Sequence, residues 1–163
     1  MTITTKSLMH HYKEIKRAAS FMLSMQAEED KARAVYDYIK KWDTNADLPD
    51  LFEASQNRLY GEERVLIATA HFIEDIEATG QQKGLFKSYK DCDSDADYEA
   101  VFCGYLHKVA EGLRAEDSVI TRGLARILFT HIEAESYYHQ HHGLASYTEN
   151  GLSEAQVISK VFE

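Results

Sequence analysis

The sequence has little of what interrupts helices or crosslinks a chain. Among 163 residues there is one proline (Pro49), eight glycines and two cysteines. Strand-rich chains need many turns, and turns draw on glycine and proline, so their scarcity favours helices. Cys92 and Cys103 do not have the CxxC spacing of metal or redox motifs. We therefore expect both thiols to be reduced, because a chain of this length can form a core without disulfides.

Long hydrophobic runs and catalytic signatures are also absent. Residues 65–73 (VLIATAHFI) form a short apolar run, whereas a membrane-spanning helix needs about 20 such residues. The first thirty residues include Lys6, Lys13, Lys16 and Arg17 beside Glu14, Glu28 and Glu29, so we expect no signal-peptide core. There is no GxSxG motif and no glycine-rich phosphate loop. The sequence predicts a cytoplasmic protein with no membrane partner and argues against an enzyme.

Charge is unevenly distributed along the chain. The net charge is −9, yet residues 1–42 hold eight basic and five acidic side chains, which leaves ten basic and 22 acidic ones for residues 43–163. Such a surface repels phosphates, so we expect no nucleic acid bound by direct phosphate contact. A protein partner with a basic surface fits this charge better.

Helical periodicity predicts an all-α, single-domain bundle of five to six amphipathic helices covering residues 1–163. A first segment, residues 5–26, buries the stripe Leu8, His11, Ile15, Ala19 and Met22. A second stripe, up to residue 42, consists of Ala32, Val35, Ile39 and Trp42. The pattern leaves open whether residues 5–42 form one helix or two.

Start and stop signals divide the remainder. A third helix is expected from Pro49 to about Gly80, and a fourth begins in the acidic cluster at residues 93–99. Asp117 or Ser118 caps a fifth helix, which Gly143 ends, and we favour two helices over one across residues 97–142. Ser153 and Gln156 form a capping box that starts a short helix over about 153–162. The expected buried stripes are Phe52, Ser55, Leu59, Glu62, Leu66, Thr69 and Ile73, then Val101, Phe102, Tyr105, Val109 and Leu113, then Ile120, Leu124, Ile127, Leu128 and Ile132.

Four of the eight histidines have a carboxylate four residues later, the spacing that places two side chains on one helical face. The same spacing is that of an ordinary stabilising pair, so most of these pairs are expected to be solvated. The four pairs are His10 with Glu14, His71 with Asp75, His107 with Glu111, and His131 with Glu135.

One of these pairs continues a buried stripe and suggests a metal site. His131 and Glu135 lie seven residues after Leu124 and Leu128. Carboxylates and histidines buried in a helical core must form ion pairs with each other, be neutralised by protonation of the carboxylate, or bind a cation. The candidate ligands for iron or zinc are His11, Glu62, Glu116, His131, Glu135, His139 and His142. No Glu-x-x-His pair occurs, which argues against a ferritin-like di-iron bundle.

Two functions are therefore predicted. The first is a small acidic helical protein that binds another protein in a regulatory, adaptor or inhibitory role. The alternative is a metal-binding bundle with a His/Glu site, for which a redox role is open. A homodimer through the exposed flank of a long helix is compatible with both.

Overall fold

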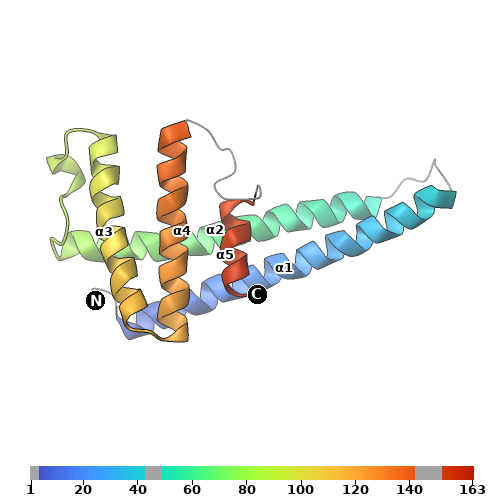
Figure 1. The fold of residues 1–163 in the computed structure, drawn as a ribbon, viewed down its shortest axis with the longest axis horizontal. Coiled ribbons are helices and arrows are strands. Elements are labelled where there is room, and N and C mark those ends of the chain that lie inside the picture. The colour runs from blue at the N-terminus through green and yellow to red at the C-terminus, as the bar shows by residue number, and fades with distance from the viewer. Residues whose placement is uncertain (1–3, 43–48, 142–151) are drawn as a thin grey trace.

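The computed structural model describes residues 4–42, 49–141 and 152–163, which fold into five α-helices and one short 3-10 helix (Figure 1). No strand occurs in these residues. The prediction of an all-α, single-domain bundle is confirmed. None of the helices in the described ranges combines the length and hydrophobicity that crossing a bilayer requires. The elements are α1 (Thr5–Trp42), α2 (Pro49–Gln82), η1 (Tyr89–Asp91), α3 (Asp95–Ala115), α4 (Val119–His141) and α5 (Glu154–Val161).

Residues 5–42, whose division the sequence left open, form one continuous helix, α1. The stretch that joins its two apolar stripes, residues 23–34, contains no glycine or proline and is rich in alanine and charged residues. These residue types have high intrinsic helix propensity, so the backbone has no reason to break there. The acidic residues at positions 28–30 consequently lie within α1 and do not start a second helix.

The other helix starts follow the signals in the sequence. Ser94 caps α3 by accepting a hydrogen bond from the Asp97 amide, and Ser118 accepts one from the Thr121 amide at the start of α4. Ser153 and Gln156 form the predicted capping box of α5. Asp117, with a φ of 53°, separates α3 from α4. The preference for two helices across residues 97–142 is thus confirmed.

Two helical hairpins and α5 make up the fold (Figure 1). The long helices α1 and α2 lie antiparallel along each other, and α3 and α4 form a second hairpin that crosses one end of the first. The short α5 contacts α1, α2 and α4 near the middle of the long hairpin. We call residues 5–22 and 61–82 the proximal half of the long hairpin, and residues 23–42 and 49–60 its distal half. The distal half extends beyond α5, away from α3 and α4.

The hydrophobic core lies on the proximal half. Every fully buried side chain of α1 falls between Leu8 and Met22, although the helix continues for twenty more residues. Burying a large aliphatic or aromatic side chain contributes roughly 1.5–3 kcal/mol, so the stability of the bundle is concentrated here. The largest fully buried side chains are Ile15, Met22, Val65, Phe72, Ile76, Leu106, Leu113, Leu124, Ile127, Leu128 and Ile158.

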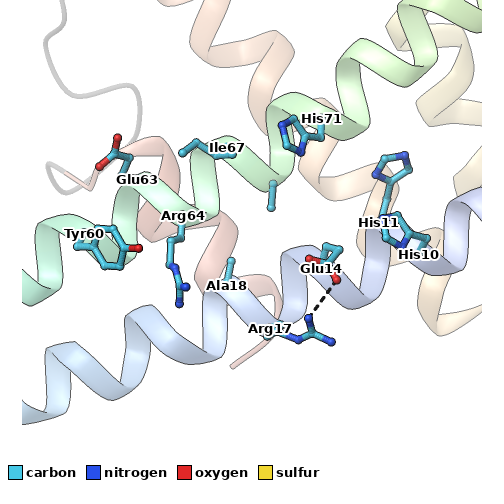
Figure 2. A pocket seen from close by; sticks show the side chains of 11 residues that line it. His10, His11, Glu14, Arg17, Ala18, Tyr60, Glu63, Arg64, Ile67 and His71 are labelled. Atoms are coloured by element: carbon cyan, nitrogen blue, oxygen red, sulfur yellow. Dashed lines mark hydrogen bonds and ion pairs between the residues drawn. The ribbon is translucent and has the colours of Figure 1, made fainter.

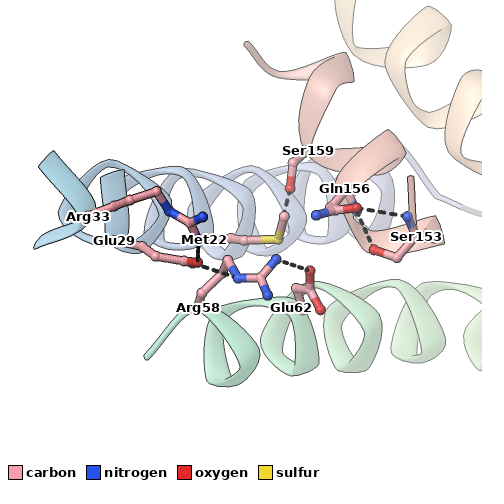
Figure 3. Close-up of polar contacts among 8 residues, drawn as sticks. All are labelled: Met22, Glu29, Arg33, Arg58, Glu62, Ser153, Gln156 and Ser159. Atoms are coloured by element: carbon pink, nitrogen blue, oxygen red, sulfur yellow. Dashed lines mark hydrogen bonds and ion pairs between the residues drawn. The ribbon is translucent and has the colours of Figure 1, made fainter. Parts of the chain in front are cut away.

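Helix α5 closes the core where the proximal half ends. Its Ser159 is buried and donates a hydrogen bond of 3.3 Å to the sulfur of Met22 on α1 (Figure 3). Phe162, just after α5, packs edge-on against Tyr12 of α1. These contacts fix α5 against the long hairpin, so the core is assembled from all five helices.

The buried face of α2 differs from the predicted one. Leu59 and Leu66, expected inside, are 49% and 42% exposed, whereas Ala54 and Gly61 are buried. A Cβ atom at Gly61 would lie 2.9 Å from the Cα of Met22, so only glycine allows α1 this close. Thr69 and Ile73 of the predicted stripe are buried, as expected. The prediction was wrong for Leu59 and Leu66, because a hydrophobicity pattern gives little weight to the small residues that permit close helix packing.

Candidate functional site

His11, predicted on the buried face of α1, is only 8% exposed. Its Nε2 lies 3.0 Å from Oδ2 of Asp75 on α2, and the Ser7 hydroxyl donates a 2.6 Å hydrogen bond to the same oxygen. The pKa of Asp75 is lowered, chiefly by the hydrogen bond from Ser7. Burial opposes this shift, and His11 adds to it. The buried histidine therefore has a carboxylate partner and needs no metal to satisfy it.

Ser7, Asp75 and His11 are the residue types of a catalytic triad in a different arrangement. In a triad the histidine contacts the serine and takes its proton. Here both Ser7 and His11 contact the carboxylate of Asp75. The histidine does not contact the serine, so this cluster lacks the geometry of a triad and instead ties α1 to α2.

His131 forms a second, separate cluster at the junction of α4 and α5. Its Nδ1 lies 3.1 Å from Oε1 of Glu154, the first residue of α5, and its Nε2 lies 3.9 Å from Oε1 of Glu135. The predicted His131–Glu135 pair is thus formed. Glu154 was not predicted as a site residue, because a contact between two helices leaves no trace in the local spacing.

Glu62 pairs with a basic residue on its own helix. Arg58 on α2 reaches Glu62 at 3.8 Å, and its Nε lies 2.7 Å from Oε2 of Glu29 on α1, without the alignment of a hydrogen bond (Figure 3). Arg33 adds a contact to Glu29 at 3.5 Å. These charges bridge α1 and α2 in the distal half and near its boundary, so Glu62 belongs to a salt-bridge network.

The other proposed ligands lie apart from these clusters. Glu116, predicted on the buried stripe of α3, is exposed at the end of that helix, which corrects the prediction. The last buried residue of α3 is Leu113, and Glu116 follows as the C-cap residue, beyond the packed part of the helix. The side chain of His139 and all of His142 fall outside the described residues.

The structure therefore does not bring the five proposed ligands whose side chains it describes together as one site. His131 and Glu135 meet, His11 pairs with Asp75, and Glu62 pairs with Arg58. Among the described side chains, no group of three or more histidine, cysteine or carboxylate residues has a geometry that holds a metal ion. An iron or zinc site that includes His139 or His142 stays a prediction.

Both cysteines are free thiols, as expected. Burial, followed by the Glu135 and Glu99 carboxylates, raises the pKa of Cys103. Loss of solvation and the nearby Asp97 raise the pKa of Cys92. A reactive cysteine needs a lowered pKa, so neither thiol is activated as a nucleophile.

The outer face of distal α1 carries an unexpected apolar surface. Val35, Tyr38 and Trp42 are 53%, 68% and 73% exposed, and their spacing of three and four residues places them on one side of the helix. We call these three residues the α1 patch. Val35 and Trp42 had been predicted on one apolar stripe, and within the described residues no third helix covers that stripe.

Lysines flank the α1 patch at the end of the helix. Lys41 lies over the ring of Trp42, with 5.6 Å from Nζ to the ring centroid, and Lys40 lies over Tyr36 at the same distance. Cation–π contacts of this kind stabilise an aromatic ring while leaving much of its surface accessible. The patch therefore combines two exposed aromatic rings with adjacent positive charge.

No protein-family model matches the chain, and neither the curated protein sequences nor the solved structures give a significant match. Function therefore has to be inferred from the residues and their geometry.

Proposed function

We propose that this protein is a helical adaptor or regulator that binds another protein through the α1 patch. The observation that supports the proposal is the alignment of Val35, Tyr38 and Trp42 on one exposed face of a helix. Tyrosine and tryptophan dominate the energetics of protein–protein interfaces, because they bury a large area and still offer a polar group. A contiguous apolar face that water solvates poorly gains free energy when a partner covers it.

The position of exposed apolar residues supports the long hairpin as the binding surface. Within the described residues, seven of the ten exposed large hydrophobic side chains lie on α1 and α2. The other three, Leu85, Tyr89 and Val119, occur singly at separate places in the fold. Isolated exposed apolar residues are normal on a protein surface, whereas an aligned set is typical of an interface.

The local charge indicates the kind of partner. Lys40 and Lys41 lie beside the α1 patch, so we propose a partner that presents an apolar surface bordered by acidic residues. The acidic excess of residues 43–163, which favours a partner with a basic surface, lies elsewhere in the chain and remains a separate prediction. The double variant Lys40→Glu, Lys41→Glu distinguishes a partner with an acidic border from a partner with a basic surface. This charge reversal weakens binding only if the surface bound by the α1 patch is acidic.

Site-specific photo-crosslinking tests the proposal. A photoreactive phenylalanine analogue replaces Tyr38 in one variant and Val119 in a control variant, and both are irradiated in cells that naturally contain the protein. The two original side chains are almost equally exposed, at 68% and 67%. We expect one partner protein to be crosslinked from position 38 and absent from position 119. Equal crosslinking at both positions contradicts the proposal. Crosslinks only to a second copy of the chain also contradict it and indicate a homodimer through the α1 patch.

Affinity for the identified partner then provides the quantitative check. The triple variant Val35→Ser, Tyr38→Ser, Trp42→Ser should lose at least about tenfold in affinity, because truncating interface aromatics commonly costs 2 kcal/mol or more. The matched control Leu85→Ser, Tyr89→Ser, Val119→Ser should bind within about twofold of the wild type. Circular dichroism confirms that both variants remain folded. Unchanged affinity of the first triple variant removes the α1 patch from the interface.

A further inference from the structure

A cleft of about 490 Å³ lies along one side of the long hairpin, between α1 and α2 (Figure 2). The described residues that line it all belong to these two helices. Ala18, Ile67 and Ala68 provide apolar surface, and charged or aromatic side chains surround them. Its volume is in the range of small-molecule sites, which combine apolar surface with a few polar groups that orient the ligand.

Arg64 is the unusual group in this cleft. Its guanidinium lies 4.5 Å from the ring centroid of Phe21 and 5.1 Å from that of Tyr60, and Figure 2 shows the side chain extending from α2 toward α1. Among the described residues it forms no ion pair with a carboxylate. The cation–π contacts with these two rings restrain the guanidinium. With no described carboxylate paired to it, its N–H donors are left for a planar oxyanion.

The other arginine of the cleft is already compensated. Arg17 contacts Glu14 at 3.2 Å on the α1 side of the cleft. Glu63 also lines the cleft, but Figure 2 shows its carboxylate directed away from Arg64. The imidazoles of His10 and His71 provide further hydrogen-bonding groups at the opposite end. The uncompensated positive charge is therefore that of Arg64.

We propose that this cleft binds a small monocarboxylate with an apolar body, and that Arg64 holds its carboxylate. The apolar body lies against Ala18, Ile67 and Ala68. A carboxylate fits the planar fork of an arginine with two parallel hydrogen bonds. Glu14 and Glu63 oppose ligands with several negative charges, so a singly charged anion is favoured over a phosphate monoester or a nucleotide. This site is separate from the α1 patch and does not depend on the function proposed for it.

The test titrates the full chain, with its arginine side chains labelled with nitrogen-15, against benzoate as the probe. Benzamide, which has the same ring and no charge, and phenyl phosphate serve as comparison ligands. We expect benzoate to shift the Arg64 Nε–H resonance saturably and to bind at least about tenfold more tightly than benzamide, because a charge-assisted hydrogen bond is stronger than a neutral one. Equal binding of benzoate and benzamide overturns the proposal, and tighter binding of phenyl phosphate overturns the preference for a singly charged anion.

Matched variants show whether Arg64 is the contact. Arg64→Gln should lose at least about tenfold in benzoate affinity, and Arg64→Lys should retain part of it, because lysine keeps the charge without the planar fork. Arg114→Gln is the control, since Arg114 also stacks on one aromatic ring, Phe129 at 5.3 Å, outside the cleft. It should bind benzoate as the wild type does, as should the triple variant of the α1 patch. Unchanged affinity of Arg64→Gln in a folded protein overturns the proposal.

Discussion

The proximal and distal halves of the long hairpin are made from the same two helices, yet they are stabilised differently. The proximal half of α1 buries Leu8, Ile15, Ala19 and Met22 under the other helices, whereas no residue of α1 after Met22 is fully buried. The distal half of α2 buries Ala54 and relies on the charges of Arg58 and Glu29 to hold it to α1. A two-helix segment buries little apolar surface, so the partner proposed above would supply to the distal half the apolar burial that the core supplies to the proximal half.

The largest difference between the halves should appear on truncating one aromatic residue in each. Phe72 is 0% exposed and its ring packs against His11, so Phe72→Ala should lower the free energy of unfolding by about 3–5 kcal/mol. Trp42→Ala, which removes a larger but exposed ring, should change it by less than about 0.5 kcal/mol. Urea denaturation measures both. A loss of several kcal/mol for Trp42→Ala would show that the distal half is packed like the proximal one.

Glycine replacement tests the close approach at the boundary of the two halves. Gly61→Ala forces a Cβ to within 2.9 Å of the Met22 backbone and should cost about 1–3 kcal/mol. Gly104→Ala, on an exposed face of α3 with no heavy atom within 4 Å of the new Cβ, should stabilise by up to about 1 kcal/mol. The midpoint of thermal denaturation should therefore fall for Gly61→Ala and rise for Gly104→Ala. Equal shifts would mean that α1 and α2 are not in contact at Gly61.

Removing the charge bridge should weaken the distal half selectively. Arg58→Gln leaves half-buried Glu29 with only Arg33, and we expect a loss of about 1 kcal/mol. The readout is the rate of tryptic cleavage after Lys31 and Arg33, which should rise while sites in the proximal half stay protected. Arg122→Gln removes an exposed pair with Asp117 at the α3–α4 turn and is the control. An equal rise in the control would show that the effect is not local to the distal half.

Two buried threonines of the bundle should respond oppositely to the same change. Thr69 is 2% exposed and its hydroxyl has no hydrogen-bond partner among the described residues, so Thr69→Val should stabilise by about 1 kcal/mol. Thr121 is 6% exposed, and its hydroxyl bonds with Ser118 at the start of α4, so Thr121→Val should destabilise by a similar amount. Urea denaturation measures both. The same sign for the two variants would contradict the hydrogen bonding described here.

The smallest expected effect is the pH response of the tie between Ser7, His11 and Asp75. The lowered pKa of Asp75 means that its stabilising contribution is present above its ordinary pKa of 3.8 and is lost as the pH falls through the lower value in the folded state. Ser7→Ala removes the largest cause and should raise the pKa of Asp75 toward 3.8. The carbon-13 chemical shift of the Asp75 carboxyl, followed during acid titration, measures this change. An unchanged titration in Ser7→Ala would show that the serine does not bind the carboxylate.

Local signals in the sequence predicted the helices well because they act within a few residues. The capping box at Ser153, the cap at Ser118 and the buried stripe from Leu8 to Met22 all form as predicted. These features depend on neighbouring residues along the chain, which the sequence displays directly.

Contacts between helices could not be predicted in this way. The sequence paired His71 with Asp75 by spacing, but the structure pairs Asp75 with His11, 64 residues away. The stripe through Val35 and Trp42 has the periodicity of a buried face, yet it is exposed because no helix in the described part of the chain covers it. Periodicity identifies the apolar side of a helix, and the tertiary arrangement decides what covers it.

Amide hydrogen exchange along α1 in the isolated protein tests the difference between the two halves most directly. Because one continuous helix crosses both, any difference in protection reports tertiary packing rather than secondary structure. We predict that amides of residues 12–22 exchange only with global unfolding and that those of residues 30–42 exchange much faster, through local opening. Equal protection over the whole of α1 would contradict the account, because the distal half would then be stable without a partner.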